Sequence, residues 1–174
     1  QEAGRPMPGR TVVLSGSCSQ MTNLQVRNYK DIAPHFALDV DSCFDDQHYG
    51  EQVCNWVMKN LDGDRAPLVY ATADTGKLKE IQAKFGVEAS SQAVEKLFSK
   101  LAAMLKERGV KNFIIAGGET SGTITQSLEV SGFYIGPQIA PGVPWVKSLD
   151  GELSLALKSG NFGDPHFFTT AQEF

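Results

Sequence analysis

A run of small residues between a strand and a helix is the segment of this sequence best suited to bind an anion. The Gly-Gly-Glu-Thr-Ser-Gly segment at 117–122 follows the apolar run 111–116, which has the composition of a buried strand, and precedes a helical pattern. Glycines let an anion approach the main chain, and the start of a helix offers unpaired N–H groups and a positive dipole end. The segment therefore predicts a phosphate-binding loop.

Two further loops of small polar residues also follow strand-like runs, at 15–19 and 72–76. Parallel strands joined by right-handed crossovers bring their C-terminal ends to one edge of a sheet, where ligands of open α/β sheets bind. Convergence of the three loops predicts an anion site at that edge, whereas a tight turn is the alternative interpretation of each loop alone. A fourth glycine cluster, at 158–163, is open to two interpretations: a terminal turn, or a loop over a nucleotide base or ribose.

Neither standard nucleotide-binding fingerprint is present. A P-loop requires G-x-x-x-x-G-K-[ST], and Thr75-Gly76-Lys77 is only a fragment of that pattern. The Rossmann G-x-G-x-x-G pattern is also missing, because the 15–19 loop contains one glycine. Classical NAD binding is therefore disfavoured.

Alternating strand and helix patterns must position these loops. Strands are expected at 11–14, 35–40, 67–72 and 112–116, and helices at 21–30, 47–61, 90–108 and 121–131. Three short strands are expected after them, at 133–139, 144–149 and 152–158. The order predicts an α/β fold: a three-layer, mostly parallel Rossmann-like sheet with helices on both faces and a C-terminal antiparallel strand extension.

Composition limits the classes of partner. The chain has 174 residues, 41% of them hydrophobic, and a net charge of −4 without a basic run, which argues against nucleic acid. No apolar run approaches the roughly 20 residues of a membrane span. Three unpaired cysteines, Cys18, Cys43 and Cys54, fit a reducing compartment, so a cytoplasmic location and small buried thiols are expected.

The first nine residues are polar and rich in glycine and proline, and the first of them is not methionine. We interpret residues 1–9 as a linker from a missing N-terminal domain, and residues 10–174 as one nucleotide-binding domain.

Other reactive groups predict no metal or hydrolase site. Aspartates at 39, 41, 45 and 46 are expected to form an acidic loop, because Cys43 stands where a calcium loop needs an oxygen ligand. The three histidines lack ligand spacing. A serine nucleophile at Ser15 or Ser17 would need G-x-S-x-G, and Leu14 occupies the place of its first glycine.

Taken together, the glycine and serine clusters resemble the C-terminal nucleotide-binding domain of the four-carbon acid sugar kinases, a family that includes the 3-oxo-tetronate, D-threonate and erythronate kinases. The matching segments are 12–19, 116–122, 141–145 and 157–163. The resemblance implies an ATP-dependent kinase in which an N-terminal domain binds the sugar acid and this domain binds ATP. The positions that match the family's ATP contacts are Ser15, Gly117, Gly118, Glu119, Thr120 and Gly160, with Ser17, Pro141 and Trp145 as weaker candidates.

The expected roles follow from the chemistry of these residues. N–H groups of Gly117, Gly118 and Thr120 would hold phosphate oxygens, and Ser15 would donate its hydroxyl to a phosphate. Glu119 would repel phosphates unless Mg²⁺ carried by the nucleotide, or a ribose hydroxyl, lies between them. The alternative role for Glu119 is to stabilise the helix dipole.

Catalytic groups are not expected in this chain. Lys77, Lys79 and Lys158 are candidate charge partners, but each is expected to be a solvated surface lysine. Without a catalytic base, this chain alone is predicted to bind nucleotide and not to turn over. Two alternatives stay open: a stand-alone module that binds a nucleotide or phosphorylated ligand without catalysis, and an NAD-binding dehydrogenase-like domain.

Overall fold

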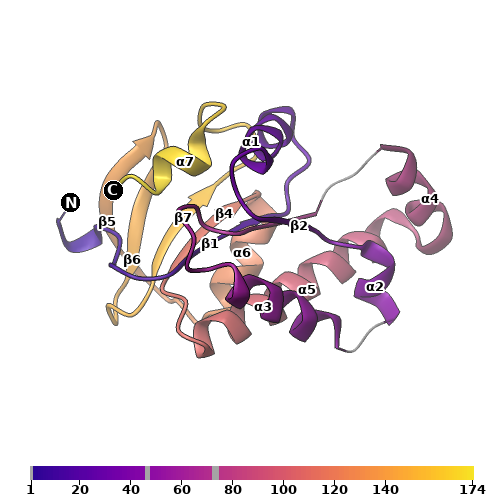
Figure 1. Cartoon of the computed structure of the whole chain (residues 1–174), viewed down its shortest axis with the longest axis horizontal. Coiled ribbons are helices and arrows are strands. Elements are labelled where there is room, and N and C mark those ends of the chain that lie inside the picture. The colour runs from indigo at the N-terminus through magenta and orange to yellow at the C-terminus, as the bar shows by residue number, and fades with distance from the viewer. Residues whose placement is uncertain (1, 46–47, 72–74) are drawn as a thin grey trace.

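A seven-stranded mixed sheet forms the centre of the protein in a computed structural model that describes residues 2–45, 48–71 and 75–174 (Figure 1). The strands lie in the order β2-β3-β1-β4-β7-β6-β5. Neighbours from β2 to β7 pair in parallel, and β6 and β5 add antiparallel pairs. Their bounds are β1 Thr11–Ser15, β2 His35–Ala37, β3 Leu68–Tyr70, β4 Asn112–Ala116, β5 Phe133–Ala140, β6 Val143–Ser148 and β7 Ser154–Lys158.

Helices cover both faces of this sheet. α1 and α7 lie on one side of it in Figure 1, and α3, α5 and α6 lie on the other. The bounds are η1 Glu2–Gly4, α1 Gln20–Lys30, α2 Val40–Asp45, α3 Tyr49–Lys59, α4 Thr75–Phe85, α5 Val87–Glu107, α6 Gly118–Ser127 and α7 Phe167–Ala171. None of these described helices is both long and apolar enough to cross a bilayer.

Two hydrophobic cores separate along the strands because successive side chains of a strand point to opposite faces. In β1, Val12 and Leu14 enter the core under α3, α5 and α6, whereas Val13 enters the core under α1 and α7. Val13 and Leu14 are fully buried, as are most residues of β1 and β4, which is typical of parallel strands covered on both sides. The predicted α/β class, mostly parallel sheet and antiparallel C-terminal extension are confirmed.

Three segments differ from the expected elements. The strand expected at 35–40 ends at Ala37. Of the four aspartates predicted to form an acidic loop, Asp41 and Asp45 belong instead to the short helix α2 at Val40–Asp45, and Asp46 lies outside the described residues. α4 and α7 were not expected, since 75–85 has weak amphipathic character and 167–171 is short. α2 and α4 are held by the stacked rings of Phe44 and Phe85, 4.1 Å apart between centroids. Such a contact between distant segments has no local sequence signal.

The segment before β1 packs against the sheet. Gly4 lies so close to Gly136 of β5 that a Cβ on either residue would overlap the other's backbone. Farther along, the Met7 N–H donates to Ser154 Oγ at 3.0 Å, and Asn112 Nδ2 donates to the Met7 carbonyl at 2.8 Å. Division of the chain into a linker at 1–9 and a domain at 10–174 stays a prediction.

Candidate functional site

Three small-residue loops leave the sheet side by side. β4 is hydrogen-bonded to both β1 and β7, and Ser15, Ala116 and Lys158 stand opposite one another in the register. The loops after β1, β4 and β7 therefore begin at the same level of the sheet. In the predicted loop at 72–76, residues 72–74 lie outside the described residues, and α4 begins at Thr75.

Ser17 lies where these loops meet. A Cβ on Gly117 would stand 3.2 Å from the backbone nitrogen of Ser17, and a Cβ on Gly160 would stand 3.1 Å from its hydroxyl oxygen. The backbone of both glycines thus approaches Ser17 within van der Waals distance. From the sequence, Ser17 was only a weak candidate for a nucleotide contact. In the structure it lies between the glycine segments that follow β4 and β7.

Two helix N-termini are part of the same cluster. α1 starts after Ser19, whose hydroxyl oxygen accepts the Thr22 N–H at 3.2 Å as an N-cap. α6 starts after Gly117, whose φ of 118° is in the region that favours glycine. Both helix starts contribute a positive dipole end to one edge of the sheet.

Of the N–H groups at the start of α6, one is hydrogen-bonded within the protein and three are available to a ligand. The Gly117 N–H, which was expected to hold a phosphate oxygen, donates instead to the Lys158 carbonyl at 2.7 Å, so it holds the β4 and β7 loops together. The first N–H groups of a helix have no partner within it, which leaves those of Gly118, Glu119 and Thr120 for a ligand. Gly118 and Glu119 are exposed, and nothing lies within 4 Å of a Cβ placed on Gly118. This open surface beside free donors is suited to an anion.

Ser15 and Gly160 lie near these N–H donors and differ in how deeply they are buried. Ser15 is fully buried, and its hydroxyl oxygen has no hydrogen-bond partner within the described part of the chain. A buried hydroxyl without a partner is unfavourable, so it is a group that a ligand or water can satisfy. Gly160 is half-buried, and its carbonyl accepts the Thr22 hydroxyl at 2.6 Å.

Lys158 corrects an expectation from the sequence, since it is fully buried and not a surface lysine. Its Nζ donates to Thr22 Oγ1 at 2.9 Å, to the Gly160 carbonyl at 2.6 Å and to the Ser159 carbonyl at 3.2 Å. Burial lowers the pKa of this amine from its ordinary value to about 8. Lys79 is exposed, as expected, and the side chain of Lys77 lies outside the described residues.

Glu95 is a residue of this site that the sequence analysis missed. It lies in α5, where one Oε accepts the Thr120 hydroxyl at 2.8 Å and the other is buried without a partner in the described structure. Burial raises the pKa of Glu95, and the nearby charge of Glu119 raises it further, while the hydrogen bond from Thr120 opposes the shift. Because its hydroxyl is committed to Glu95, Thr120 offers a ligand its backbone N–H.

A cavity of about 300 Å³ adjoins Glu95 at the carboxyl ends of β1 and β3. Gly16 and Cys18 line one side of it, and Val94 and Glu95 of α5 line another. Cys18 is exposed here, in contrast to the expectation of buried thiols, whereas Cys54 is buried. The cavity therefore lies beside the loop that contains Ser17.

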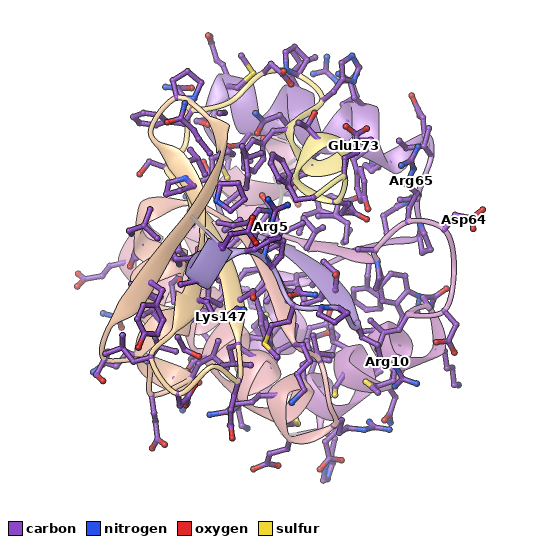
Figure 2. The ribbon with its side chains drawn as sticks, turned by 90° about the vertical axis from the view of Figure 1, so that its left-hand side faces the viewer. Arg5, Arg10, Asp64, Arg65, Lys147 and Glu173 are labelled. Carbon is purple, nitrogen blue, oxygen red and sulfur yellow. The ribbon has the colours of Figure 1, made fainter. Side chains whose placement is uncertain are left out.

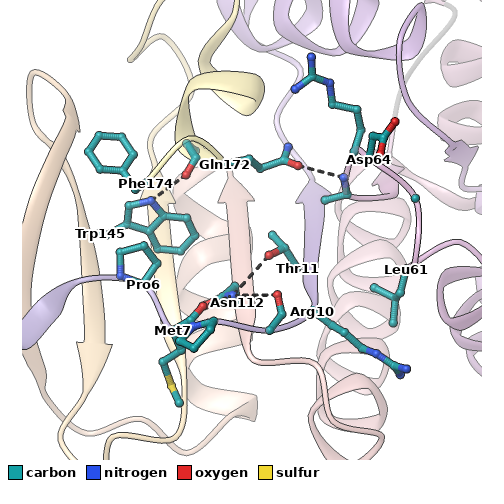
Figure 3. Close-up of a pocket in the computed structure, with 16 residues that line it drawn as sticks. Pro6, Met7, Arg10, Thr11, Leu61, Asp64, Asn112, Trp145, Gln172 and Phe174 are labelled. Atoms are coloured by element: carbon teal, nitrogen blue, oxygen red, sulfur yellow. Dashed lines mark hydrogen bonds between the residues drawn. The ribbon is translucent and has the colours of Figure 1, made fainter.

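A second cavity, of about 390 Å³, lies at the opposite ends of the strands (Figure 3). Thr11 and Asn112, which begin β1 and β4, line it together with Trp145, whose Nε1 donates to the Ala171 carbonyl at 2.9 Å. Figure 2 shows charged side chains around this face, among them Arg10 and Arg65. The weak candidate Trp145 thus lines this second cavity, and in the sheet it stands opposite Ala156, two residues before Lys158.

Pro141, the other weak candidate, is exposed in the turn between β5 and β6. The next residue, Gly142, has a φ of 79° and lies against the ring of Phe162, to which a Cβ would approach within 2.9 Å. The turn thus contacts the glycine loop after β7. In residues 2–45, 48–71 and 75–174, no group of three or more His, Cys, Asp and Glu side chains is arranged to hold a metal ion.

Comparison with known families gives a match over most of the chain. A family model described as the nucleotide-binding C-terminal domain matches residues 12–168. A 3-oxo-tetronate kinase of Haemophilus influenzae is 56% identical over 167 residues, which make up 96% of this chain and 40% of that protein. A 3-oxo-tetronate kinase of Brucella melitensis is 53% identical over 173 residues, 99% of this chain and 40% of that protein. The chain therefore spans about two fifths of the length of these relatives.

Solved structures share the fold. The crystal structure of a Haemophilus influenzae protein superposes with a TM-score of 0.92 at 56% identity, over 96% of this chain and 40% of that one. A Bordetella bronchiseptica protein, solved as a domain-swapped dimer with bound citrate, superposes with a TM-score of 0.71 at 17% identity, over 93% and 40% of the two chains. At that identity the likeness is one of fold alone.

Proposed function

This chain belongs to the family of nucleotide-binding C-terminal domains, and from that membership we propose that it is the ATP-binding domain of a four-carbon sugar-acid kinase. Relatives above 50% identity are named 3-oxo-tetronate kinases, so 3-oxo-tetronate is the proposed type of substrate. The nucleotide is ATP before transfer and ADP after it. A cytoplasmic location is part of the same proposal.

The observation that carries the proposal is the meeting of the loops after β1, β4 and β7 at the start of α6. The N–H groups of Gly118, Glu119 and Thr120 stand at a helix N-terminus that is open to solvent at Gly118. Phosphate groups bind at such helix starts because donors and dipole act together. Ser15, Gly117 and Gly160 complete the proposed nucleotide contacts: Ser15 with an unpartnered hydroxyl, and the two glycines with backbone close to Ser17.

Mg²⁺ enters the proposal as an ion carried by the nucleotide. Magnesium is commonly held by one or two carboxylates together with substrate phosphates. Glu119, exposed in the first turn of α6, is the carboxylate proposed to face the ion's water shell or the ribose. The charge on Mg²⁺ would neutralise phosphate charge during transfer.

The sugar acid is proposed to bind mainly to an N-terminal domain, outside the part of the relatives that this chain matches. The relatives are more than twice as long as the chain, which leaves room for such a domain in the full-length protein. Phosphoryl transfer would then occur between the two domains, and this chain alone would bind nucleotide without turnover.

Isothermal titration calorimetry with ADP–Mg²⁺ and with NAD⁺ tests the proposal. Heat with ADP and none with NAD⁺ is expected, and the reverse result would favour a dehydrogenase-like domain. Absence of binding to any adenine nucleotide would contradict the proposal. The full-length protein is then assayed with ATP and 3-oxo-tetronate; ADP binding without transfer to a four-carbon sugar acid would favour a stand-alone binding module.

A further inference from the structure

Lys158 is a cation enclosed by uncharged groups. It is fully buried, and it has no salt bridge within 4.0 Å in the described part of the chain. Its three N–H donors match three oxygen acceptors: the Thr22 hydroxyl and the carbonyls of Ser159 and Gly160. A buried charge is ordinarily paired, so an unpaired one at the edge of a proposed anion site needs an explanation.

We propose that Lys158 is a positioning residue of the nucleotide site, and that its ammonium supplies positive charge to the bound phosphates from beneath the Gly160 turn. The inference rests on the proposed function, because it takes the nucleotide's phosphates as the anion. It goes beyond that function by assigning a role to a residue that would not contact the nucleotide.

The positioning role follows from bonds made by both ends of the residue. The Lys158 carbonyl accepts the Gly117 N–H, and its Nζ donates to the Gly160 carbonyl. One residue therefore holds the two glycine segments at a fixed separation. Thr22 completes the arrangement, because its hydroxyl accepts from Nζ and donates to the same Gly160 carbonyl.

The electrostatic role of Lys158 follows from the burial of its ammonium group. A charge in a low-dielectric interior acts on a nearby anion more strongly than a solvated charge does. Burial lowers the pKa of the amine to about 8, so the folded protein carries the charge at a cost that a neighbouring phosphate would offset. The N-termini of α1 and α6 flank the same place and add partial positive charge.

Calorimetric titration of the full-length protein with adenosine, AMP and ADP tests this role. In the wild type, affinity is expected to rise with each phosphate. Lys158→Met, which has a similar shape and no charge, is expected to bind ADP at least tenfold more weakly while adenosine binding stays within twofold. A merely structural defect would weaken adenosine and ADP alike, so a parallel loss would overturn the proposal.

Two further variants separate charge from folding. Lys147→Met makes the same change in β6, at the opposite end of the strand pair, and is expected to bind ADP like the wild type. Thr22→Val keeps the ammonium and removes one acceptor and the link to Gly160, so about threefold weaker ADP binding with unchanged adenosine binding is expected. If Lys158→Met does not fold, Thr22→Val decides, and wild-type ADP affinity in that variant would overturn the proposal. Failure of the wild type to bind any adenine nucleotide would contradict the proposed function itself.

Discussion

The Thr120 hydroxyl donates a hydrogen bond of 2.8 Å to the carboxylate of Glu95, which ties the first turn of α6 to the middle of α5. The bond crosses 25 residues of sequence and lies directly behind the proposed phosphate donors. It fixes the side chain of Thr120 away from the ligand and orients the turn that carries the free N–H groups. A change at this bond is therefore expected to alter both the stability of the protein and its proposed nucleotide binding.

Glu95→Ala is expected to lower the free energy of unfolding by about 1–2 kcal/mol, since it leaves the buried Thr120 hydroxyl without an acceptor. Glu95→Gln is the matched control, because its amide oxygen can still accept that bond. Urea unfolding of both variants measures the effect. Equal stability of the two variants would show that the Thr120 bond contributes nothing.

Gly16→Ala is expected to destabilise the protein by about 1–3 kcal/mol, because a Cβ at this position would overlap Thr120 Oγ1. The Thr120 hydroxyl cannot move aside without losing its hydrogen bond to Glu95. Gly122→Ala, on α6 with nothing within 4 Å of its Cβ, serves as the control and is expected to be neutral or slightly stabilising. Thermal unfolding compares the two, and a stable Gly16→Ala would refute the packing described here.

Gly118→Val tests the proposed phosphate surface. Nothing lies within 4 Å of a Cβ on Gly118 in the free protein, so cooperative unfolding is expected to persist while ADP binding is lost by at least tenfold. Gly122→Val makes the same exchange one turn later on the same helix, and it should leave ADP binding intact. Calorimetry on the pair gives the comparison, and ADP affinity equal in both would mean that the site is elsewhere.

Gly160→Val is expected to abolish nucleotide binding for an additional reason. A Cβ on Gly160 would approach Ser19 Cβ to 2.9 Å and Ser17 Oγ to 3.1 Å, so the N-cap of α1 must shift as well. We therefore expect some loss of stability with this variant, unlike Gly118→Val. Circular dichroism during heating, alongside the ADP titration, separates the two effects, and full ADP affinity would exclude the Gly160 turn from the site.

The depressed pKa of Lys158 predicts a specific dependence of stability on pH. The folded protein releases this proton near pH 8, whereas the unfolded chain holds it to about the ordinary value of 10.5. Between these values the unfolded state binds more protons, so this group makes wild-type stability rise with pH, by up to about 1 kcal/mol from pH 8 to 9. Below pH 8 both states are protonated and the contribution is flat.

Denaturant unfolding of wild type and Lys158→Met at pH 7, 8 and 9 isolates this contribution, because other groups titrate in both proteins. The difference in unfolding free energy is expected to change in favour of the wild type as pH rises above 8. A constant difference over that range would mean that the amine is not perturbed.

Local patterns were sufficient to predict much of the fold. Buried runs such as Asn112–Ala116 carry a strong strand signal, and the helix periodicity of 90–108 marks most of α5. The order of strands and helices then predicts a parallel sheet with its loops at one edge. The small-residue segments at those loops were identified because glycine and serine leave the backbone there accessible to a ligand.

Contacts between distant residues account for what the sequence did not reveal. Glu95 has the spacing of an ordinary helix residue, and only packing of α6 on α5 brings it to Thr120. Lys158 was assigned to the surface because lysine is rarely buried, and its burial depends on Thr22, 136 residues away. Both residues acquire their role from tertiary structure.

The alternation of side chains along β7 has a consequence for how the chain can change in length. Leu155 enters the core beneath α5 and α6, Ala156 enters the core beneath α1, and Lys158 follows Ala156 at the spacing of two that keeps it on the α1 side. Insertion or deletion of a single residue between Ala156 and Lys158 would turn the amine toward the opposite layer, away from Thr22. The position of Lys158 along β7 therefore decides which face of the sheet its side chain lies on. We expect β7 to tolerate substitutions far better than changes in its length.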